Sequence, residues 1–150
     1  MPGVEGAKLL GYLLLITKSG DMGAFLIGSK FGRHTLLPKV SPNKSVEGSI
    51  GALAVSAVVA IVFRSLLPPE CQFPLWQIAL MGVFFSALGQ LGDLSESLIK
   101  RDCGVKDSGK LLPGLGGILD MIDSLLFAAP AFYLYMSSTL KTLPVVVYAH

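Results

Sequence analysis

The stretch CQFPLWQIALMGVFFSALGQLG, residues 71–92, runs for 22 residues without an Asp, Glu, Lys or Arg. A helix that crosses a bilayer needs roughly 20 mostly apolar residues, so this stretch is long enough to span one. Residues 48–63 and 124–140 are uncharged as well. The whole chain is 52% hydrophobic and 15% charged, whereas soluble domains carry about a quarter charged residues. The sequence therefore predicts an integral membrane protein, rather than a soluble core that contains three uncharged helices.

A fourth apolar segment, residues 7–29, is interrupted by Lys18 and Asp21. It does not resemble a signal peptide, because Glu5 precedes it and no clear cleavage site follows. Charges inside a membrane helix are costly and indicate a functional site by default, and two residues three apart can pair on one helical face. We expect one membrane-embedded domain over residues 1–150, with an all-α polytopic transmembrane helix bundle. Its four membrane helices are expected at about 7–29, 48–67, 74–97 and 117–139.

Positive charge is concentrated in two of the three loops between these helices. Residues 30–47 and residues 98–116 each hold four Lys or Arg, whereas residues 66–73 hold none. Because basic residues concentrate in cytoplasmic loops, we expect the first and third loops to face the cytoplasm together. Orientation alone would explain these charges, but it does not explain the acidic residues beside them.

Two pairs of acidic residues lie near the expected ends of the third and fourth helices: Asp93 with Glu96, and Asp120 with Asp123. Residues three apart on a helix lie about 4.5 Å apart along the axis and about 60° apart around it, so each pair would share a face. Neighbouring carboxylates at the bilayer edge repel each other unless a cation lies between them. Mg²⁺ takes one or two carboxylates together with water and phosphate oxygens. Helix capping is the alternative for Asp120 and Asp123, and Asp93 on the same side favours the metal.

The third loop carries a specific pattern. Residues 97–107, SLIKRDCGVKD, and 112–124, LPGLGGILDMIDS, resemble the signature of the phosphatidate cytidylyltransferases, or CDP-diacylglycerol synthases. That signature reads Ser-x-x-Lys-Arg, four residues, Lys-Asp, then Pro-Gly-His-Gly-Gly-x-x-Asp-Arg-x-Asp. Residues 41–48, SPNKSVEG, are similar to the Ser-Pro-x-Lys-Thr-x-Glu-Gly stretch of the family, and residues 21–33 also look like family segments. The resemblance covers about residues 12–135.

The chain departs from the family pattern at two positions. Leu115 stands where the family has histidine, and Met121 stands where it has the arginine between the aspartates. Neither side chain can carry a proton or a charge, so no role is carried over to either. Family members usually have additional membrane helices before the matched region, so the chain is expected to be either a fragment or a short product that retains the catalytic half.

The resemblance implies a reaction in which the phosphate of phosphatidic acid attacks the α-phosphorus of CTP and releases pyrophosphate. It implies a Mg²⁺ cofactor, with a second cation for which K⁺ is a candidate. The expected metal ligands are Asp93, Asp120 and Asp123, and the expected catalytic residues are these three with Lys106. The expected substrate-binding residues are Asp21, Ser41, Lys44, Glu47, Lys100 and Arg101.

The expected location is the bacterial inner membrane, with the active site toward the cytoplasm. The expected partners are CTP, phosphatidic acid and membrane lipids, with a homodimer left open and no nucleic acid. Two other functions stay open: a CTP-dependent kinase of polyprenol or another lipid alcohol, and an inactive, truncated membrane assembly partner. The Asp-Gly-x-x-Ala-Arg core of the CDP-alcohol phosphotransferases does not occur in the sequence.

Overall fold

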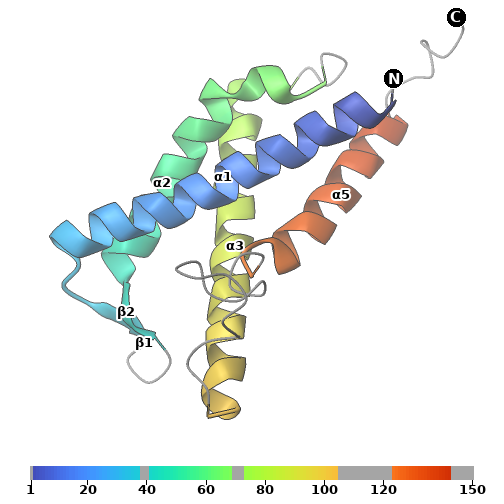
Figure 1. Ribbon diagram of the computed structural model, residues 1–150. Helices are drawn as coiled ribbons and strands as arrows, with labels where there is room; N and C mark the ends of the chain where they lie inside the picture. The colour runs from blue at the N-terminus through green and yellow to red at the C-terminus, as the bar shows by residue number, and fades with distance from the viewer. Residues whose placement is uncertain (1, 38–40, 69–72, 105–122, 143–150) are drawn as a thin grey trace, which may run out of the picture.

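The computed structural model describes residues 2–37, 41–68, 73–104 and 123–142, and within these ranges it is mostly helical. The elements in chain order are α1 (Pro2–Phe31), β1 (Thr35–Leu37), β2 (Ser41–Ser45), α2 (Val46–Val62), the 3-10 turn η1 (Arg64–Leu66), α3 (Leu75–Asp102) and α5 (Leu125–Thr142). Figure 1 shows α1 crossing α2 and α3, with α5 beside the amino-terminal half of α1. The predicted helical bundle is confirmed.

The segment predicted as the first loop contains an antiparallel hairpin, in which Thr35 pairs with Ser45 and Leu37 with Ser41. Ser45 ends β2 and also caps α2, because its Oγ accepts a hydrogen bond of 3.1 Å from the backbone N–H of Gly48. A side-chain oxygen at this position satisfies one of the free N–H groups at the start of a helix. The hairpin therefore leads directly into α2 and lies at the end of the bundle where α1 terminates (Figure 1).

Several predicted helix boundaries are wrong. The first helix begins at Pro2 rather than at residue 7, and the second ends at Val62 rather than at residue 67. The third helix continues to Asp102 rather than ending at residue 97, which extends it by about 7 Å. The fourth helix begins at Leu125, and the residues just before it, Asp123 and Ser124, form a turn. The prediction that Asp123 lies on a helix is therefore incorrect, and residues 117–122 of the predicted helix lie outside the described part of the chain.

The apolar core lies where α1, α3 and α5 meet, on the half of α1 that is remote from the hairpin. Phe85 of α3 packs edge-on against Phe132 of α5, with ring centroids 5.1 Å apart. The Tyr12 hydroxyl donates a hydrogen bond of 3.1 Å to the backbone carbonyl of Ala60, which ties α1 to α2. The remaining buried apolar residues of this cluster include Leu13, Ile16, Ile78, Met81, Ala128 and Met136.

Small residues allow the helices to approach closely where they cross. A Cβ atom added to Gly20 of α1 would lie 2.6 Å from the Oγ of Ser56 and 2.7 Å from the Oγ of Ser86. A Cβ atom on Gly82 of α3 would lie 2.7 Å from the backbone carbonyl oxygen of Ser56 and 2.8 Å from the Cβ of Ala60. These two glycines therefore fix how closely α1 and α3 approach α2, as expected for packing through small residues.

The outer surface of the bundle is strongly apolar. Phe25 is 73% exposed, Leu134 68% and Ile50 62%. Contiguous exposed apolar surface on a folded protein indicates contact with a partner or with lipid. By length and composition two helices could cross a membrane, Gly6–Phe31 and Leu75–Asp102, and α2 is a shorter apolar helix. Within the described residues, two of the four predicted membrane helices thus meet the length requirement, and the exposed apolar side chains support a membrane location.

We predict that Gly82→Ala destabilises the bundle by about 1–3 kcal/mol, the usual effect of overpacking a close contact. The added methyl group meets backbone atoms of α2, which cannot rotate away. Thermal unfolding of the detergent-purified protein should show a lower midpoint. Gly11→Ala is the matched control, since nothing lies within 4 Å of a Cβ at that position in α1. Equal midpoints for the two variants would contradict the packing argument.

Candidate functional site

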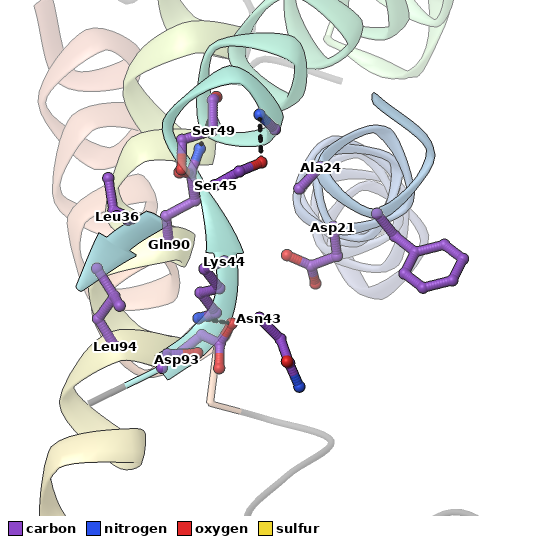
Figure 2. Close-up of a pocket in the computed structure, with 13 residues that line it drawn as sticks. Asp21, Ala24, Leu36, Asn43, Lys44, Ser45, Ser49, Gln90, Asp93 and Leu94 are labelled. Atoms are coloured by element: carbon purple, nitrogen blue, oxygen red, sulfur yellow. Dashed lines mark hydrogen bonds and ion pairs between the residues drawn. The ribbon is translucent and has the colours of Figure 1, made fainter. Parts of the chain in front are cut away.

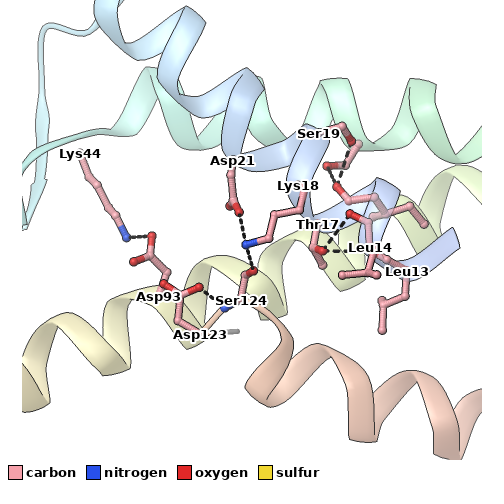
Figure 3. Close-up of polar contacts among 12 residues, drawn as sticks. Leu13, Leu14, Thr17, Lys18, Ser19, Asp21, Lys44, Asp93, Asp123 and Ser124 are labelled. Carbon is pink, nitrogen blue, oxygen red and sulfur yellow. Dashed lines mark hydrogen bonds and ion pairs between the residues drawn. The ribbon is translucent and has the colours of Figure 1, made fainter. Parts of the chain in front are cut away.

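Charged side chains from four elements meet at the end of the bundle that carries the hairpin (Figure 3). The ammonium group of Lys44, on β2, forms an ion pair with the carboxylate of Asp93, on α3. Lys18 of α1 lies between two partners, with its Nζ 3.5 Å from Asp21 Oδ2 and 3.0 Å from Ser124 Oγ. The predicted pairing of Lys18 with Asp21 is therefore confirmed.

Asp123 lies in the turn before α5 and close to α3. The backbone of α3 can approach this turn because residue 92 is glycine, and a Cβ there would clash with the carbonyl oxygen of Asp123. The pKa of Asp123 is raised to about 7, mainly by burial and also by the negative charges of Asp93 and Glu96, while a hydrogen bond from the backbone N–H of Ser124 acts in the opposite direction. Asp93 and Asp123 therefore converge, as their placement in the sequence predicted.

Glu96 is placed one turn beyond Asp93 on α3 and is 4% exposed. Its Oε1 atom lies 2.6 Å from the Nζ of Lys100, four residues further along the helix. Lys100, predicted to bind substrate, thus compensates a buried carboxylate. Arg101 lies on the exposed end of α3 beside Leu98, and neither Lys100 nor Arg101 is among the described residues that line the cavity near Asp93.

A cavity of about 280 Å³ opens beside the Lys44–Asp93 pair (Figure 2). Its size is close to the lower limit for small-molecule pockets, which is about 300 Å³. Its walls come from α1, the hairpin, α2 and α3, and they combine charged groups with apolar side chains. The lining residues are Asp21, Ala24, Phe25, Leu36, Ser41, Asn43, Lys44, Ser45, Gly48, Ser49, Gln90, Asp93 and Leu94. Four predicted site residues are thus gathered around one space: Asp21, Ser41, Lys44 and Asp93.

Four polar residues of this cavity were missed by the sequence prediction: Asn43, Ser45, Ser49 and Gln90. Gln90 lies on α3 three residues before Asp93, and its amide donates to the backbone carbonyl of Ser49 at 3.4 Å. Residues three apart on a helix lie on one face, so the position of Gln90 relative to Asp93 could have indicated that both side chains face the same space. Asn43 precedes Lys44 in the same motif, at the position that the family pattern leaves unspecified.

Glu47 was predicted to bind substrate, and the structure places it elsewhere. Its Oε2 accepts hydrogen bonds from the backbone N–H groups of Arg33 and His34, at 3.1 and 3.3 Å. Its Oε1 lies 2.7 Å from Nδ1 of His34. The contact with His34 is the largest of the effects that lower the pKa of Glu47 to about 2, and the backbone hydrogen bonds add to it. Glu47 thus joins the start of α2 to the segment that enters the hairpin.

The oxygen and nitrogen ligands available at the site determine whether it could hold a metal ion. Among the described residues, no three His, Cys, Asp or Glu side chains lie close enough together to hold a metal ion by themselves. Asp93 and Asp123 supply two carboxylates, which is the number Mg²⁺ usually takes from a protein when phosphates and water fill its other positions. Asp120 and Lys106 lie outside the described residues, as do Leu115 and Met121.

The fold and the site define an apolar helical bundle in which acidic and basic side chains are paired beside a cavity. Residues 2–139 match the Cytidylyltransferase family. The chain is 42% identical to the phosphatidate cytidylyltransferase of Bacillus subtilis (strain 168), over 88% of this chain and 48% of that protein. It is 44% identical to the uncharacterized protein YnbB of Escherichia coli (strain K12), over 87% of this chain and 43% of that protein.

A third relative, the phosphatidate cytidylyltransferase of Staphylococcus epidermidis (strain ATCC 12228 / FDA PCI 1200), is 40% identical over 90% of this chain and 51% of its own length. The chain therefore belongs to the cytidylyltransferase family, which confirms the resemblance seen in the sequence. It spans about half the length of the curated relatives it matches.

We predict that Glu47→Ala loosens the hairpin without removing any group from the cavity. Amide hydrogen exchange at residues 33–37 and 41–46 should become at least about tenfold faster, because two hydrogen bonds to backbone N–H groups are lost. Val58→Ala, at an exposed position on the same helix, should leave these rates unchanged.

The same contact has a defined pH dependence. Because the folded-state pKa of Glu47 is lowered from 4.5 to about 2, its contribution is fully present above pH 4.5 and is lost as the pH falls through about 2. Protection that depends on Glu47 should therefore fall as the pH is lowered from 4.5 toward 2. Protection that stays unchanged over that range would show that this carboxylate does not hold the hairpin.

Proposed function

We propose that this chain transfers the cytidylyl group of CTP to phosphatidic acid, forming CDP-diacylglycerol and pyrophosphate at a Mg²⁺-dependent site. Family membership supports this proposal. The observation that carries it is the arrangement in which Lys44 pairs with Asp93 beside Asp123, at the edge of a cavity with charged and apolar walls. A phosphate-bearing lipid has both kinds of surface, and so does a nucleotide.

The proposed reaction does not require the protein to remove a proton from the attacking group. The phosphate oxygen of phosphatidic acid is already anionic, and it forms a bond to the α-phosphorus of CTP while the bond to the β-phosphate oxygen breaks. Pyrophosphate leaves with the electron pair of that bond. Such transfers depend mainly on positioning and charge neutralisation. A leucine at position 115, where the family has histidine, is compatible with this chemistry.

Asp93 and Asp123 are the described residues that would hold Mg²⁺, and Asp120 is proposed as a third ligand. A bound Mg²⁺ supplies neutralisation of phosphate charge and orientation of the reacting groups. The raised pKa of Asp123 supports this assignment, because a carboxylate that is buried near other carboxylates keeps its charge more easily beside a cation.

The location and the ion pair of Lys44 both suit a phosphate-binding role. Its side chain lines the cavity, and its ammonium group is paired with Asp93. A cation on Asp93 would neutralise that carboxylate and leave the ammonium group available to the phosphates of the substrate. Ser41 and Asn43, from the same hairpin, lie on the same cavity wall and can donate hydrogen bonds.

We also propose that this end of the bundle faces the cytoplasm of a bacterial cell. The segment that precedes α2 and the end of α3 both carry clustered Lys and Arg, and the ion pair between Lys44 and Asp93 holds these two regions at the same end. Clustered basic residues favour the cytoplasmic side, where CTP is made. Membrane lipids and phosphatidic acid would reach the site from the apolar flank.

We predict that Asp93→Asn and Asp123→Asn each lower cytidylyl transfer by about a hundredfold or more, since even groups that only support a metal ligand contribute about 10–100-fold. The assay follows incorporation of CTP labelled at the α-phosphorus into lipid, in membranes that contain this chain alone. Asp102→Asn is the matched control, because it removes an exposed carboxylate from the same helix. Wild-type rates in both site variants would refute the metal assignment.

The position of the label also separates the alternatives. A lipid-alcohol kinase would transfer label from the γ-phosphorus of CTP and leave CDP as the product, whereas a cytidylyltransferase incorporates label from the α-phosphorus. Purified chain without Mg²⁺-dependent turnover of CTP in the presence of phosphatidic acid would contradict the proposal and favour the assembly partner.

A further inference from the structure

Lys18 is a charged residue well inside α1, which is long and apolar enough to cross a membrane. A charge at such a position is costly and needs a partner. Its ammonium group reaches away from its own helix to Ser124 Oγ, 3.0 Å away and 106 residues further along the chain. Asp21, three residues further along α1, lies 3.5 Å from the same ammonium group and holds it from the other side. Figure 3 shows Lys18 directed into the space between α1 and the turn before α5.

Ser124 connects Lys18 to the carboxylate of Asp123. The side chain of Ser124 is fully buried, and its backbone N–H donates a hydrogen bond to Asp123 Oδ1. The same residue therefore accepts a hydrogen bond from the ammonium group through its Oγ and donates one to the carboxylate through its backbone. The contact with Lys18 therefore holds the turn that carries this N–H, and a displacement of the turn would shift the N–H and the Asp123 carboxylate that accepts from it.

The turn is held on its opposite side by α3. A Cβ added to Gly89 would lie 3.4 Å from the carbonyl oxygen of Ser124, and one added to Gly92 would clash with the carbonyl oxygen of Asp123. These contacts set the distance between the turn and α3, and none of them is a hydrogen bond. The hydrogen bond from Lys18 to the Oγ of Ser124 anchors the turn to α1.

We propose that Lys18 is a positioning residue that sets the orientation of the Asp123 carboxylate through Ser124, and that it thereby sets the affinity of the site for a divalent cation. This inference rests on the metal role proposed above for Asp123. Lys18 touches neither the cation nor the substrate, and it is not among the described residues that line the cavity. Its hydrogen bond acts on cation binding through Ser124, and removal of either partner breaks that hydrogen bond.

The experiment measures Mn²⁺ binding by electron paramagnetic resonance, using the full chain purified in detergent. Lys18→Met and Ser124→Ala should each weaken Mn²⁺ binding by about tenfold, within the 10–100-fold range of residues that support metal ligands. The double variant should bind no more weakly than Lys18→Met alone, because Lys18→Met already removes the hydrogen bond to Ser124, in addition to the ion pair with Asp21. Lys18→Arg keeps the charge and the donor groups, so it should stay within about threefold of the wild type.

Lys8→Met is the matched control, because Lys8 is an exposed lysine of the same helix, about 15 Å along the axis from Lys18. Its Mn²⁺ affinity should equal that of the wild type. If Lys18→Met does not accumulate as a folded protein, Ser124→Ala carries the test, since it removes a single hydroxyl group.

Three outcomes would overturn the inference: wild-type affinity in Ser124→Ala, losses that multiply in the double variant, or an equal loss in Lys8→Met. In each of these cases the wild type still binds Mn²⁺ and the metal assignment stands. A wild-type chain that binds no Mn²⁺ would overturn the metal assignment and this inference together.

Discussion

Local compensation of charge is the constraint on which this end of the bundle depends. Four carboxylates are brought into an apolar helical protein here, by Asp21, Asp93, Glu96 and Asp123. Three of them lie against an ammonium group: Asp21 against Lys18, Asp93 against Lys44 and Glu96 against Lys100. An uncompensated charge would be most destabilising at Glu96, which is 4% exposed. The ion pairs therefore help to determine which elements meet, and the pair formed by Lys44 and Asp93 draws the hairpin onto α3.

Close packing of the helices makes this compensation geometrically feasible. Gly92 lets the turn before α5 lie against α3, which places Asp123 next to the face that carries Asp93. Gly20 and Gly82 bring α1 and α3 close to α2. In this packing Lys18 of α1 can reach Ser124, in the turn before α5. Larger residues at these positions would separate the helices and lengthen the ion pairs. The acidic residues and the glycines that precede or face them thus form one structural unit.

Much of this arrangement could be predicted from the sequence. Membrane helices can be recognised as long uncharged segments, and the spacing of residues within a motif is visible in the sequence itself. The pairing of Lys18 with Asp21 followed from their spacing of three residues. The proximity of Asp93 and Asp123 followed from their expected positions, near the end of the third helix and the start of the fourth. The contact of Lys100 with Glu96 has the i, i+4 spacing of a helical ion pair. That signal was present in the sequence but was overlooked, because the third helix was expected to end at residue 97.

Other features depend on tertiary contacts that no local pattern encodes. The hairpin at Thr35–Leu37 and Ser41–Ser45 lacks the alternating apolar pattern of a strand, and β2 contains a proline. It is held by Glu47, whose hydrogen bonds to Arg33 and His34 join residues 13 and 14 positions apart. The motif around Glu47 resembled a substrate-binding segment, and only the structure shows that this carboxylate is used to shape the hairpin. A motif can therefore identify the correct region of the chain without showing which of its residues bind a ligand and which hold the fold together.

The two lysines that flank the acidic residues have different surroundings, and this difference explains their different proposed roles. Lys44 enters from a hairpin at the rim of the cavity, where its partner Asp93 also lines the space open to a ligand. A lysine there can exchange a carboxylate for a phosphate, because both are anions within its reach. Lys18 enters from the middle of a long helix and ends on a buried serine. A lysine held on both sides by groups of its own chain has little freedom to follow a substrate, so its charge and its hydrogen bond act on the protein itself.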